Sequence, residues 1–289
     1  MPLTASDLVA LFDLETETPE RFIGRSPANG WKRVFGGQVV AQALVAAERT
    51  VEGRPPHSLH AYFLLGGDPL EPIRYEVERI RDGRSFTTRR VLAKQRSEVI
   101  FMMSASFQVE EAGIDDHVAM LEAPAPEDLA DSSELMRAAG ARPESVAAFE
   151  ERVRPIELRP LDADRYRPGQ GDLGDPRRLS AWIRIAGRLP DDPAIHRAAL
   201  AYLSDMTPVE SVFLARGQSI ASGKFIAASL DHALWFHRPC RADDWLLYQQ
   251  DSPNAYGARG LSRGLFFTRD GKLAADVAQE AMIRPRTPR

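Results

Sequence analysis

The chain contains two copies of one pattern, and this repeat restricts its possible folds more than any other feature. Ser58-Leu-His-Ala-Tyr-Phe63 in the first half is echoed by Ser229-Leu-Asp-His-Ala-Leu-Trp-Phe236 in the second. The copies lie roughly 170 residues apart, which is too long for a solenoid repeat and about the size of a small domain. The repeat therefore predicts two similar halves within the 289 residues, rather than one large domain.

Composition and charge exclude several classes of protein. Hydrophobic residues make up 44% of the chain and charged residues 27%, as in an ordinary soluble globular protein. The net charge of −4 provides no general attraction to nucleic acid or anionic lipid. No apolar run of about 18 residues and no signal peptide is visible, and the single cysteine, Cys240, fits a reducing compartment. We expect a cytoplasmic protein without a membrane span or a nucleic-acid partner.

In the first half, one apolar helix precedes a set of strands. Gln38–Glu48 has few polar residues and many helix formers, which predicts a buried helix. The next four runs alternate with a period of two and are rich in β-branched and aromatic residues. Asp82-Gly83 is typical of a hairpin turn, so we expect an antiparallel sheet packed on the helix. The four predicted strands are His57–Leu65, Ile73–Arg81, Phe86–Lys94 and Val99–Gln108.

The same order recurs after a segment rich in proline, glycine and charge, in which we expect mobility and one short helix around Ser145–Arg152. We therefore predict an N-terminal domain at 1–120, a linker at 121–150 and a C-terminal domain at 151–289. The fold class is α+β, with each half placing one helix against an antiparallel sheet. The predicted elements of the second half are strands at Val153–Arg159, Leu179–Ala186, Phe225–His237, Trp245–Ser252, Arg259–Thr268 and Leu273–Ile283, and a helix at Ala194–Ser204.

Two familiar catalytic patterns do not apply to this chain. Gly260-Leu-Ser262-Arg-Gly264 matches the G-x-S-x-G motif of serine hydrolases, but that motif needs a following helix and a later histidine. A strand and a hairpin follow here, and the last histidine is His237. None of the six histidines has the spacing of a zinc site, so we expect no metal and no cofactor. His60 and His232 occupy equivalent places in the repeat, which predicts a shared structural role.

The second half carries polar groups that the first half lacks. Asp205 lies in or at the end of an apolar helical stretch, where an unpaired carboxylate would cost several kcal/mol. Asp-x-Thr-Pro is also a good helix-stop sequence, and on the residues alone this capping role is favoured over catalysis. Gln279 lies on the apolar face of the last strand, and Ser229 opens the repeated strand with a hydroxyl. The first half has Gly36-Gly37 in the region that corresponds to Asp205.

Several long motifs, in the same order, resemble the type II (TesB-like) acyl-CoA thioesterase family. The resemblance covers both halves from about Phe22 to Met282, apart from the linker. It implies a double hot-dog fold, in which two antiparallel sheets each wrap a central apolar helix within one chain. The motifs are Arg33–Leu44, His57–Leu64, Asp82–Phe86 with Arg89–Val91, Ser229–Pro239, Asp244–Tyr248 and Ala258–Gly260.

The resemblance also implies an activity and a set of site residues. The family's catalytic aspartate, hydroxyl and glutamine correspond to Asp205, Ser229 and Gln279, with serine where threonine is more usual. We expect hydrolysis of fatty acyl-CoA to a fatty acid and CoA by an activated water, with no covalent intermediate. A homo-oligomer, either a dimer or a tetramer of the double unit, is a further expectation. Candidates for substrate contact are Arg259, Gly260 and His60.

Two other functions remain open at this point. A hydratase or dehydratase acting on acyl thioesters could use the same fold, but such sites usually pair a histidine with an acid. His196 is the histidine nearest to Asp205 in sequence, which counts modestly against this class. A non-catalytic acyl-CoA-binding protein is also compatible with the fold.

Overall fold

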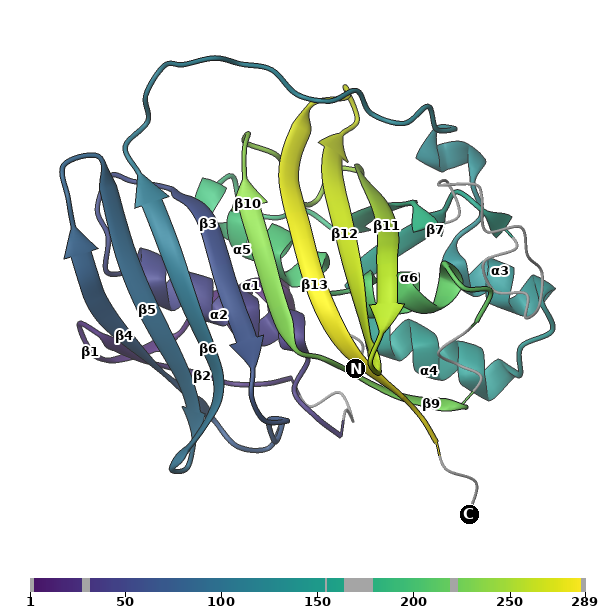
Figure 1. The fold of residues 1–289 in the computed structure, drawn as a ribbon, viewed down its shortest axis with the longest axis horizontal. Helices are drawn as coiled ribbons and strands as arrows, with labels where there is room; N and C mark the ends of the chain where they lie inside the picture. Colours follow the sequence, from purple (N-terminus) through teal and green to yellow (C-terminus); the bar gives the residue numbers. More distant parts are fainter. Residues whose placement is uncertain (1–2, 28–31, 154, 164–178, 219–222, 287–289) are drawn as a thin grey trace.

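A single antiparallel sheet of 13 strands forms the body of the molecule in the computed structural model (Figure 1). The structure describes residues 3–27, 32–153, 155–163, 179–218 and 223–286. The strand order is β1-β2-β4-β5-β6-β3-β10-β13-β12-β11-β8-β7, with β9 paired to β13 beside this path. Each half contributes the same sequence of strands, and the two halves meet where β3 pairs with β10. The two expected sheets are therefore joined edge to edge, in the double hot-dog arrangement.

The first half confirms the predicted helix and all four predicted strands. Helix α1 was not predicted. Neither were β1 and β2, short strands that pair with each other, and β2 also pairs with β4. They are the counterparts of β7 and β8 in the second half. The elements are α1 (Ala5–Phe12), β1 (Glu15–Thr18), β2 (Arg21–Gly24), α2 (Gly36–Glu48), β3 (Pro56–Phe63), β4 (Ile73–Asp82), β5 (Phe86–Gln95) and β6 (Glu98–Gln108).

The segment between the halves is more ordered than we expected. Residues 109–125 run from the end of β6 past the ends of the strands to the second half of the sheet (Figure 1). There the Leu121 N–H donates to Gln249 Oε1 at 3.1 Å, and the Trp182 indole donates to the Pro124 carbonyl at 2.9 Å. The segment also contains η1 (Pro126–Asp128), α3 (Ser132–Ala138) and α4 (Pro143–Val153). Helix α3 was not predicted, although Asp131 and Glu134 form a capping box at its start. The predicted domain limits stay a proposal, and the part of this segment at 164–178 lies outside the described residues.

The second half confirms the predicted helix and strands, with two differences. Helix α6 (Pro208–Leu214) was not predicted, and one expected strand is divided. The strand expected at Phe225–His237 is two strands, β9 (Phe225–Ser229) and β10 (Asp231–Phe236), and both pair with β13. Ser229 pairs with Ala281 and Ala233 pairs with Ala278. The chain therefore advances by four residues from β9 to β10 and by only three on β13. One extra residue is therefore accommodated at Leu230 as a β-bulge. The other elements are β7 (Ile156–Pro160), β8 (Ala181–Ile185), α5 (Pro193–Ser204), α6 (Pro208–Leu214), β11 (Leu246–Tyr256), β12 (Arg259–Thr268) and β13 (Leu273–Pro285).

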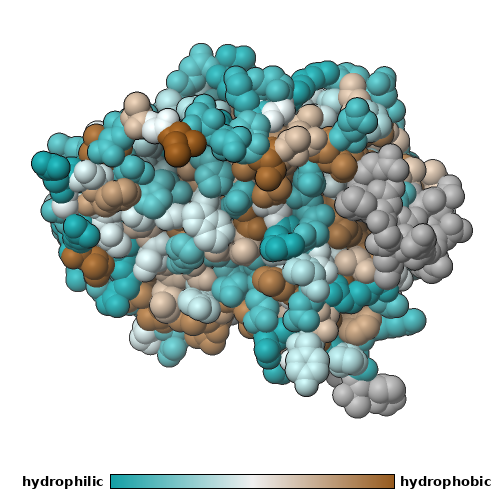
Figure 2. Space-filling model, turned by 45° about the horizontal axis from the view of Figure 1, so that its top comes forward, coloured by the Kyte–Doolittle hydropathy of each residue, from teal (hydrophilic) through white to brown (hydrophobic). Residues whose placement is uncertain are grey.

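The core lies between the sheet and the two long apolar helices. In Figure 1 the sheet faces the viewer, and α1, α2 and α5 lie behind it. Alanines on α2 and α5, such as Ala43 and Ala199, are fully buried, and their small side chains let the helices pack closely against each other. One hydrophobic cluster continues across both halves. Over the face shown in Figure 2, hydrophilic side chains are mixed with scattered hydrophobic ones. No helix in the described part of the chain is long and apolar enough to cross a membrane.

Truncating a side chain at the junction of the halves tests this arrangement. Leu234 of β10 pairs in register with Leu59 of β3, and both are fully buried. We expect Leu234→Ala to lower the free energy of unfolding by about 2–5 kcal/mol through lost burial and the resulting cavity. Ile80→Ala, at a side chain that is 56% exposed, should change it by less than about 0.5 kcal/mol. Urea unfolding measures both, and equal losses would contradict the buried junction.

Candidate functional site

Asp205 is buried where two helices of the second half meet. It is the C-cap residue of α5, and α6 begins three residues later at Pro208. Proline cannot continue α5 and disfavours helical geometry in the residue before it, so the chain turns between the two helices. The capping position expected from Asp-x-Thr-Pro is thus confirmed. Even so, Asp205 is only 8% exposed, and its side chain is directed at the other half of the molecule.

The start of α2 packs directly against Asp205. A Cβ atom on Gly36 would lie 2.5 Å from Asp205 Oδ2, and one on Gly37 would lie 2.5 Å from the Tyr202 carbonyl oxygen. Only glycine allows two helix ends to approach this closely. Phe35 supplies no side-chain cap to α2, and the Gly37 N–H donates to the Asp205 carboxyl. The positive end of the α2 dipole therefore faces a carboxylate.

The three residues predicted to form the site lie together in the fold. The Gln279 amide donates to Ser229 Oγ at 2.9 Å, and both side chains act as hydrogen-bond donors to Asp205. Gln279 is 1% exposed and projects from the inner face of β13, as the alternation of that strand predicts. The network thus combines side chains from β9, β13 and the end of α5 with a backbone N–H of α2.

His232 belongs to the same cluster, and sequence reasoning missed it. Its Nδ1 lies 2.5 Å from Gln279 Oε1 and its Nε2 lies 2.8 Å from Ser204 Oγ. In a regular strand Ser229 and His232, three residues apart, would face opposite sides of the sheet. The bulge at Leu230 turns both toward Gln279. The second copy has one more residue between its serine and its histidine than the first copy, and this difference was the signal that could have revealed the bulge.

The prediction that His60 and His232 share a structural role is wrong. His232 is fully buried, whereas His60 is exposed and its ring contacts that of Trp235 edge-on at 5.1 Å. In register, His60 pairs with Ala233 and His232 with Ala61, so the two histidines occupy opposite faces. A shift of one residue reverses the face of every side chain, and this is how the aligned histidines diverge.

Burial dominates the electrostatics of the cluster. It raises the pKa of Asp205 to about 7, although the donors from Gln279, Gly37 and Ser229 act to lower it. Burial lowers the pKa of His232 to about 4, so the ring is neutral at physiological pH. Oδ1 of Asp205 is buried and has no hydrogen-bond partner among the described residues. A carboxyl that is easily deprotonated near neutral pH, with a free acceptor atom, is suited to taking a proton from water.

The remaining candidates have different positions. Arg259 forms an ion pair with Glu280 at 3.0 Å and is half exposed at the rim of an apolar recess of about 340 Å³ beside α6. A Cβ on Gly260 would lie 2.2 Å from Val212 Cγ1, so this glycine allows α6 to pack on β12. Ser262 is a strand residue, as predicted, and its hydroxyl is buried against that of Ser211 at 2.7 Å.

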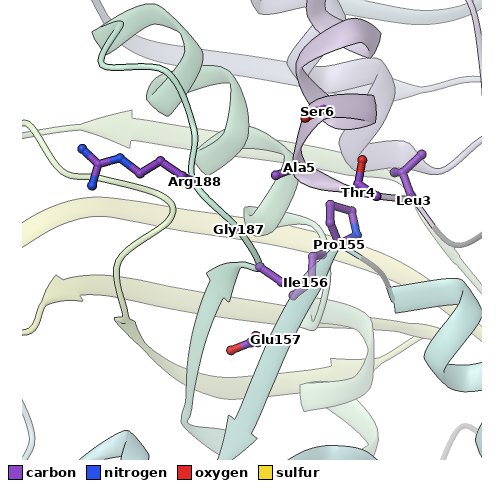
Figure 3. A pocket seen from close by; sticks show the side chains of 10 residues that line it. Leu3, Thr4, Ala5, Ser6, Pro155, Ile156, Glu157, Gly187 and Arg188 are labelled. Atoms are coloured by element: carbon purple, nitrogen blue, oxygen red, sulfur yellow. The ribbon is translucent and has the colours of Figure 1, made fainter.

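Two larger cavities lie away from Asp205. Figure 3 shows one of about 530 Å³, where the start of α1 meets β7 and Gly187. The other, of about 580 Å³, is lined by both halves near the start of α5, which is the end of that helix opposite to Asp205. Within the described ranges, no group of three or more His, Cys, Asp or Glu side chains is arranged to hold a metal ion.

Comparisons with known proteins match both halves of the chain. The family model described as acyl-CoA thioesterase matches residues 162–282, and that described as acyl-CoA thioesterase N-terminal domain matches residues 25–108. Acyl-CoA thioesterase 2 of Haemophilus influenzae is 38% identical over 96% of this chain and 97% of its own length. Human acyl-coenzyme A thioesterase 8 is 37% identical over 96% of this chain and 88% of its own length.

Solved structures show the same likeness. The TesB protein of Mycobacterium avium subsp. paratuberculosis has 34% identity and a TM-score of 0.80, over 98% of this chain and 100% of its own. The acyl-CoA thioesterase II TesB2 of Mycobacterium marinum has 39% identity and a TM-score of 0.78, over 97% of this chain and 99% of its own.

The close approach of α2 to Asp205 predicts an unusual response to alanine. Replacing a helical glycine by alanine normally stabilises a helix by about 0.5–1 kcal/mol. At Gly36 the added methyl group would instead collide with Asp205 Oδ2 and with the Phe63 ring, 2.9 Å away. We expect Gly36→Ala to destabilise the protein by about 1–3 kcal/mol in urea unfolding. Gly113→Ala, where no atom lies within 4 Å of the new methyl, is the matched control and should be neutral.

The raised pKa of Asp205 predicts a pH-dependent cost to stability. Between the ordinary value of 3.8 and about 7, the folded protein holds a proton that the unfolded chain has released. The contribution of Asp205 to stability therefore falls as the pH rises through this window. Asp205→Asn removes this loss, so its melting temperature relative to the wild type should be higher at pH 8 than at pH 5. Calorimetry at both pH values measures the difference, and the opposite order would argue against a raised pKa.

Proposed function

The chain belongs to the type II acyl-CoA thioesterase family and hydrolyses acyl-CoA thioesters, and we propose that Asp205, Ser229 and Gln279 activate the water for this reaction. The observation that carries the proposal is the buried Asp205 carboxyl, with a pKa of about 7 and donors from both halves around it. Fatty acyl-CoA is the proposed substrate, and a fatty acid and CoA are the products.

The first step is removal of a proton from water by Asp205. The water oxygen attacks the thioester carbonyl carbon while its proton passes to the carboxylate. The C–S bond then breaks, and CoA leaves as a thiolate that takes up a proton. A base with a pKa near the working pH is about half ionised and still able to accept a proton, and such a group typically contributes about 10²–10⁴-fold to the rate.

Ser229 and Gln279 orient the water and the carboxylate. A serine hydroxyl can donate and accept at once, so replacement of the family's more usual threonine keeps both functions. Serine lacks the χ1 stiffness that β-branching gives threonine. The 2.9 Å hydrogen bond from Gln279 supports a fixed position for the hydroxyl without that stiffness.

The start of α2 is suited to the negative charge that develops on the carbonyl oxygen. The first N–H groups of a helix have no partner within it, and Phe35 provides no side-chain cap. One such donor at a developing oxyanion is typically worth about 10²–10³-fold.

The structure changes one argument about the hydratase alternative. A histidine does lie at the site, although no histidine is near Asp205 in sequence. Both ring nitrogens of His232 are engaged, one by Gln279 and the other by Ser204. Because the ring is also fully buried, it is not placed to exchange protons with a substrate, and the contacts favour hydrolysis.

Other features of the proposal extend beyond the catalytic cluster. Among the substrate candidates, Arg259 at the rim of the recess beside α6 is best placed to meet a charged part of CoA. Gly260 and His60 are weaker candidates, given the packing of the one and the aromatic contact of the other. A homo-oligomer of the double unit and a cytoplasmic location stay predictions.

Activity measurements on variants test the assignment of the base. We expect Asp205→Asn to lower kcat by about 10²–10⁴-fold, measured as free thiol released from acyl-CoAs of several chain lengths. Asp270→Asn, in the exposed turn between β12 and β13, should retain wild-type turnover. Ser229→Thr should retain activity, and Gln279→Ala should lose it. Full turnover in Asp205→Asn would refute the proposal.

The pH profile gives a second test. Only the ionised carboxylate can accept a proton, so kcat/KM should rise about tenfold per pH unit below pH 7 and level off above it. The inflection should be near the pKa of about 7 and far above the usual value of 3.8. A profile flat from pH 5 to pH 8 would contradict the role of Asp205 as the base.

A further inference from the structure

The hydrogen bonds around Asp205 form a chain that ends at His232. The chain leads from the Asp205 carboxyl to Ser229, then to Gln279 and to the His232 ring. From the ring it continues to Ser204, the last residue of α5 and the neighbour of Asp205. The chain therefore leaves α5, passes through β9, β13 and β10, and returns to α5.

The charge of Asp205 fixes the direction of every bond in this chain. An ionised carboxylate only accepts hydrogen bonds, so the Ser229 hydroxyl must donate to it. Ser229 Oγ then accepts from the Gln279 NH₂ group, at 2.9 Å. This orientation leaves Gln279 Oε1, which can only accept, directed at His232 Nδ1 at 2.5 Å. Nδ1 must therefore carry the ring proton.

The other side of the ring is consistent with this tautomer. A neutral imidazole with a proton on Nδ1 has an acceptor at Nε2. Ser204 Oγ lies 2.8 Å from Nε2 and can donate its proton to it. The same hydroxyl lies 2.8 Å from the Ala201 carbonyl, to which it would donate in the opposite tautomer, so the contact of Nδ1 with Gln279 Oε1 decides between the two tautomers. The His232 ring thus lies between Ser204, at the end of α5, and Gln279, which donates to Asp205.

We propose that His232 is a positioning residue, whose Nδ1–H holds the Gln279 amide so that its NH₂ group faces Ser229 and Asp205. A half-turn of the amide would direct Oε1 at the carboxylate and place two donors, NH₂ and Nδ1–H, against each other. The proposal rests on the proposed role of Gln279 in activating the water. His232 touches neither water nor substrate in this scheme.

The test compares two amides in place of the histidine. In His232→Asn the side-chain nitrogen takes the position of Nδ1 and can still donate to Gln279. In His232→Gln the terminal atoms take the position of Nε2, near Ser204, and leave Gln279 Oε1 without a donor. We expect kcat within about fivefold of the wild type for His232→Asn and about 10–100-fold lower for His232→Gln, with KM within about threefold for both. A purely structural role predicts the reverse, because glutamine is closer to histidine in volume.

A double-mutant cycle with Gln279 separates the two proposals. If His232 acts through Gln279, His232→Gln should cause no further loss of kcat in a Gln279→Ala background. Full additivity of the two losses would overturn the positioning role while leaving Gln279 catalytic. Wild-type turnover in Gln279→Ala would instead refute the proposed function itself.

The tautomer of His232 can be measured in the wild-type protein, so it tests the proposal even if a variant does not fold. In protein labelled with ¹⁵N-histidine, His232 should give the Nδ1–H tautomer. In His232→Asn, the Gln279 side-chain NH₂ signals should stay close to their wild-type positions. The Nε2–H tautomer in the wild-type protein would overturn the proposal, because Nδ1 could then not donate to Gln279.

Discussion

The pairing of β3 with β10 is the interaction on which the rest of the structure depends. It joins the two half-sheets into one and places α2 and α5 side by side against a shared core. In this packing the start of α2 lies against the end of α5, so Gly36 and Gly37 meet Asp205. The proposed site is therefore a product of the junction, since neither half contains both the carboxyl and the helix start that faces it.

The two ends of this helix pair show why a repeated fold need not contain two equivalent sites. At the end away from Asp205, α2 finishes with Glu48, and Arg197 of α5 donates to its Oε1 at 2.9 Å. A buried carboxylate there has a cationic partner. Asp205 has no ion pair with any described residue, and its donors are neutral. Burial raises the pKa of both carboxyls, but at Glu48 the charge of Arg197 opposes this rise, whereas at Asp205 only neutral donors oppose it and the pKa is about 7.

Local sequence patterns predicted most of the fold, because helix and strand periodicities are properties of short segments. The helices α2 and α5 and the strands from β3 to β6 follow directly from them. Resemblance to a family, rather than pattern, directed attention to Asp205, Ser229 and Gln279 as a set. The strand periodicity did not predict the role of His232, because the face of this residue depends on a bulge that forms where β9 and β10 pair with β13. A pairing of strands about 50 residues apart has no signature in the periodicity of either one.

The stability of the site and its chemistry place opposite demands on the surroundings of Asp205. Burial of Asp205 opposes folding as the pH rises, and the donors from Ser229, Gln279 and Gly37 offset only part of that cost. A fourth direct donor on Oδ1 would stabilise the folded protein further, but it would also lower the pKa and occupy the atom that accepts the proton. A donor that binds Gln279, and not the carboxylate, avoids this conflict. By holding Gln279 from behind, His232 strengthens the arrangement without adding a hydrogen bond to the carboxylate itself.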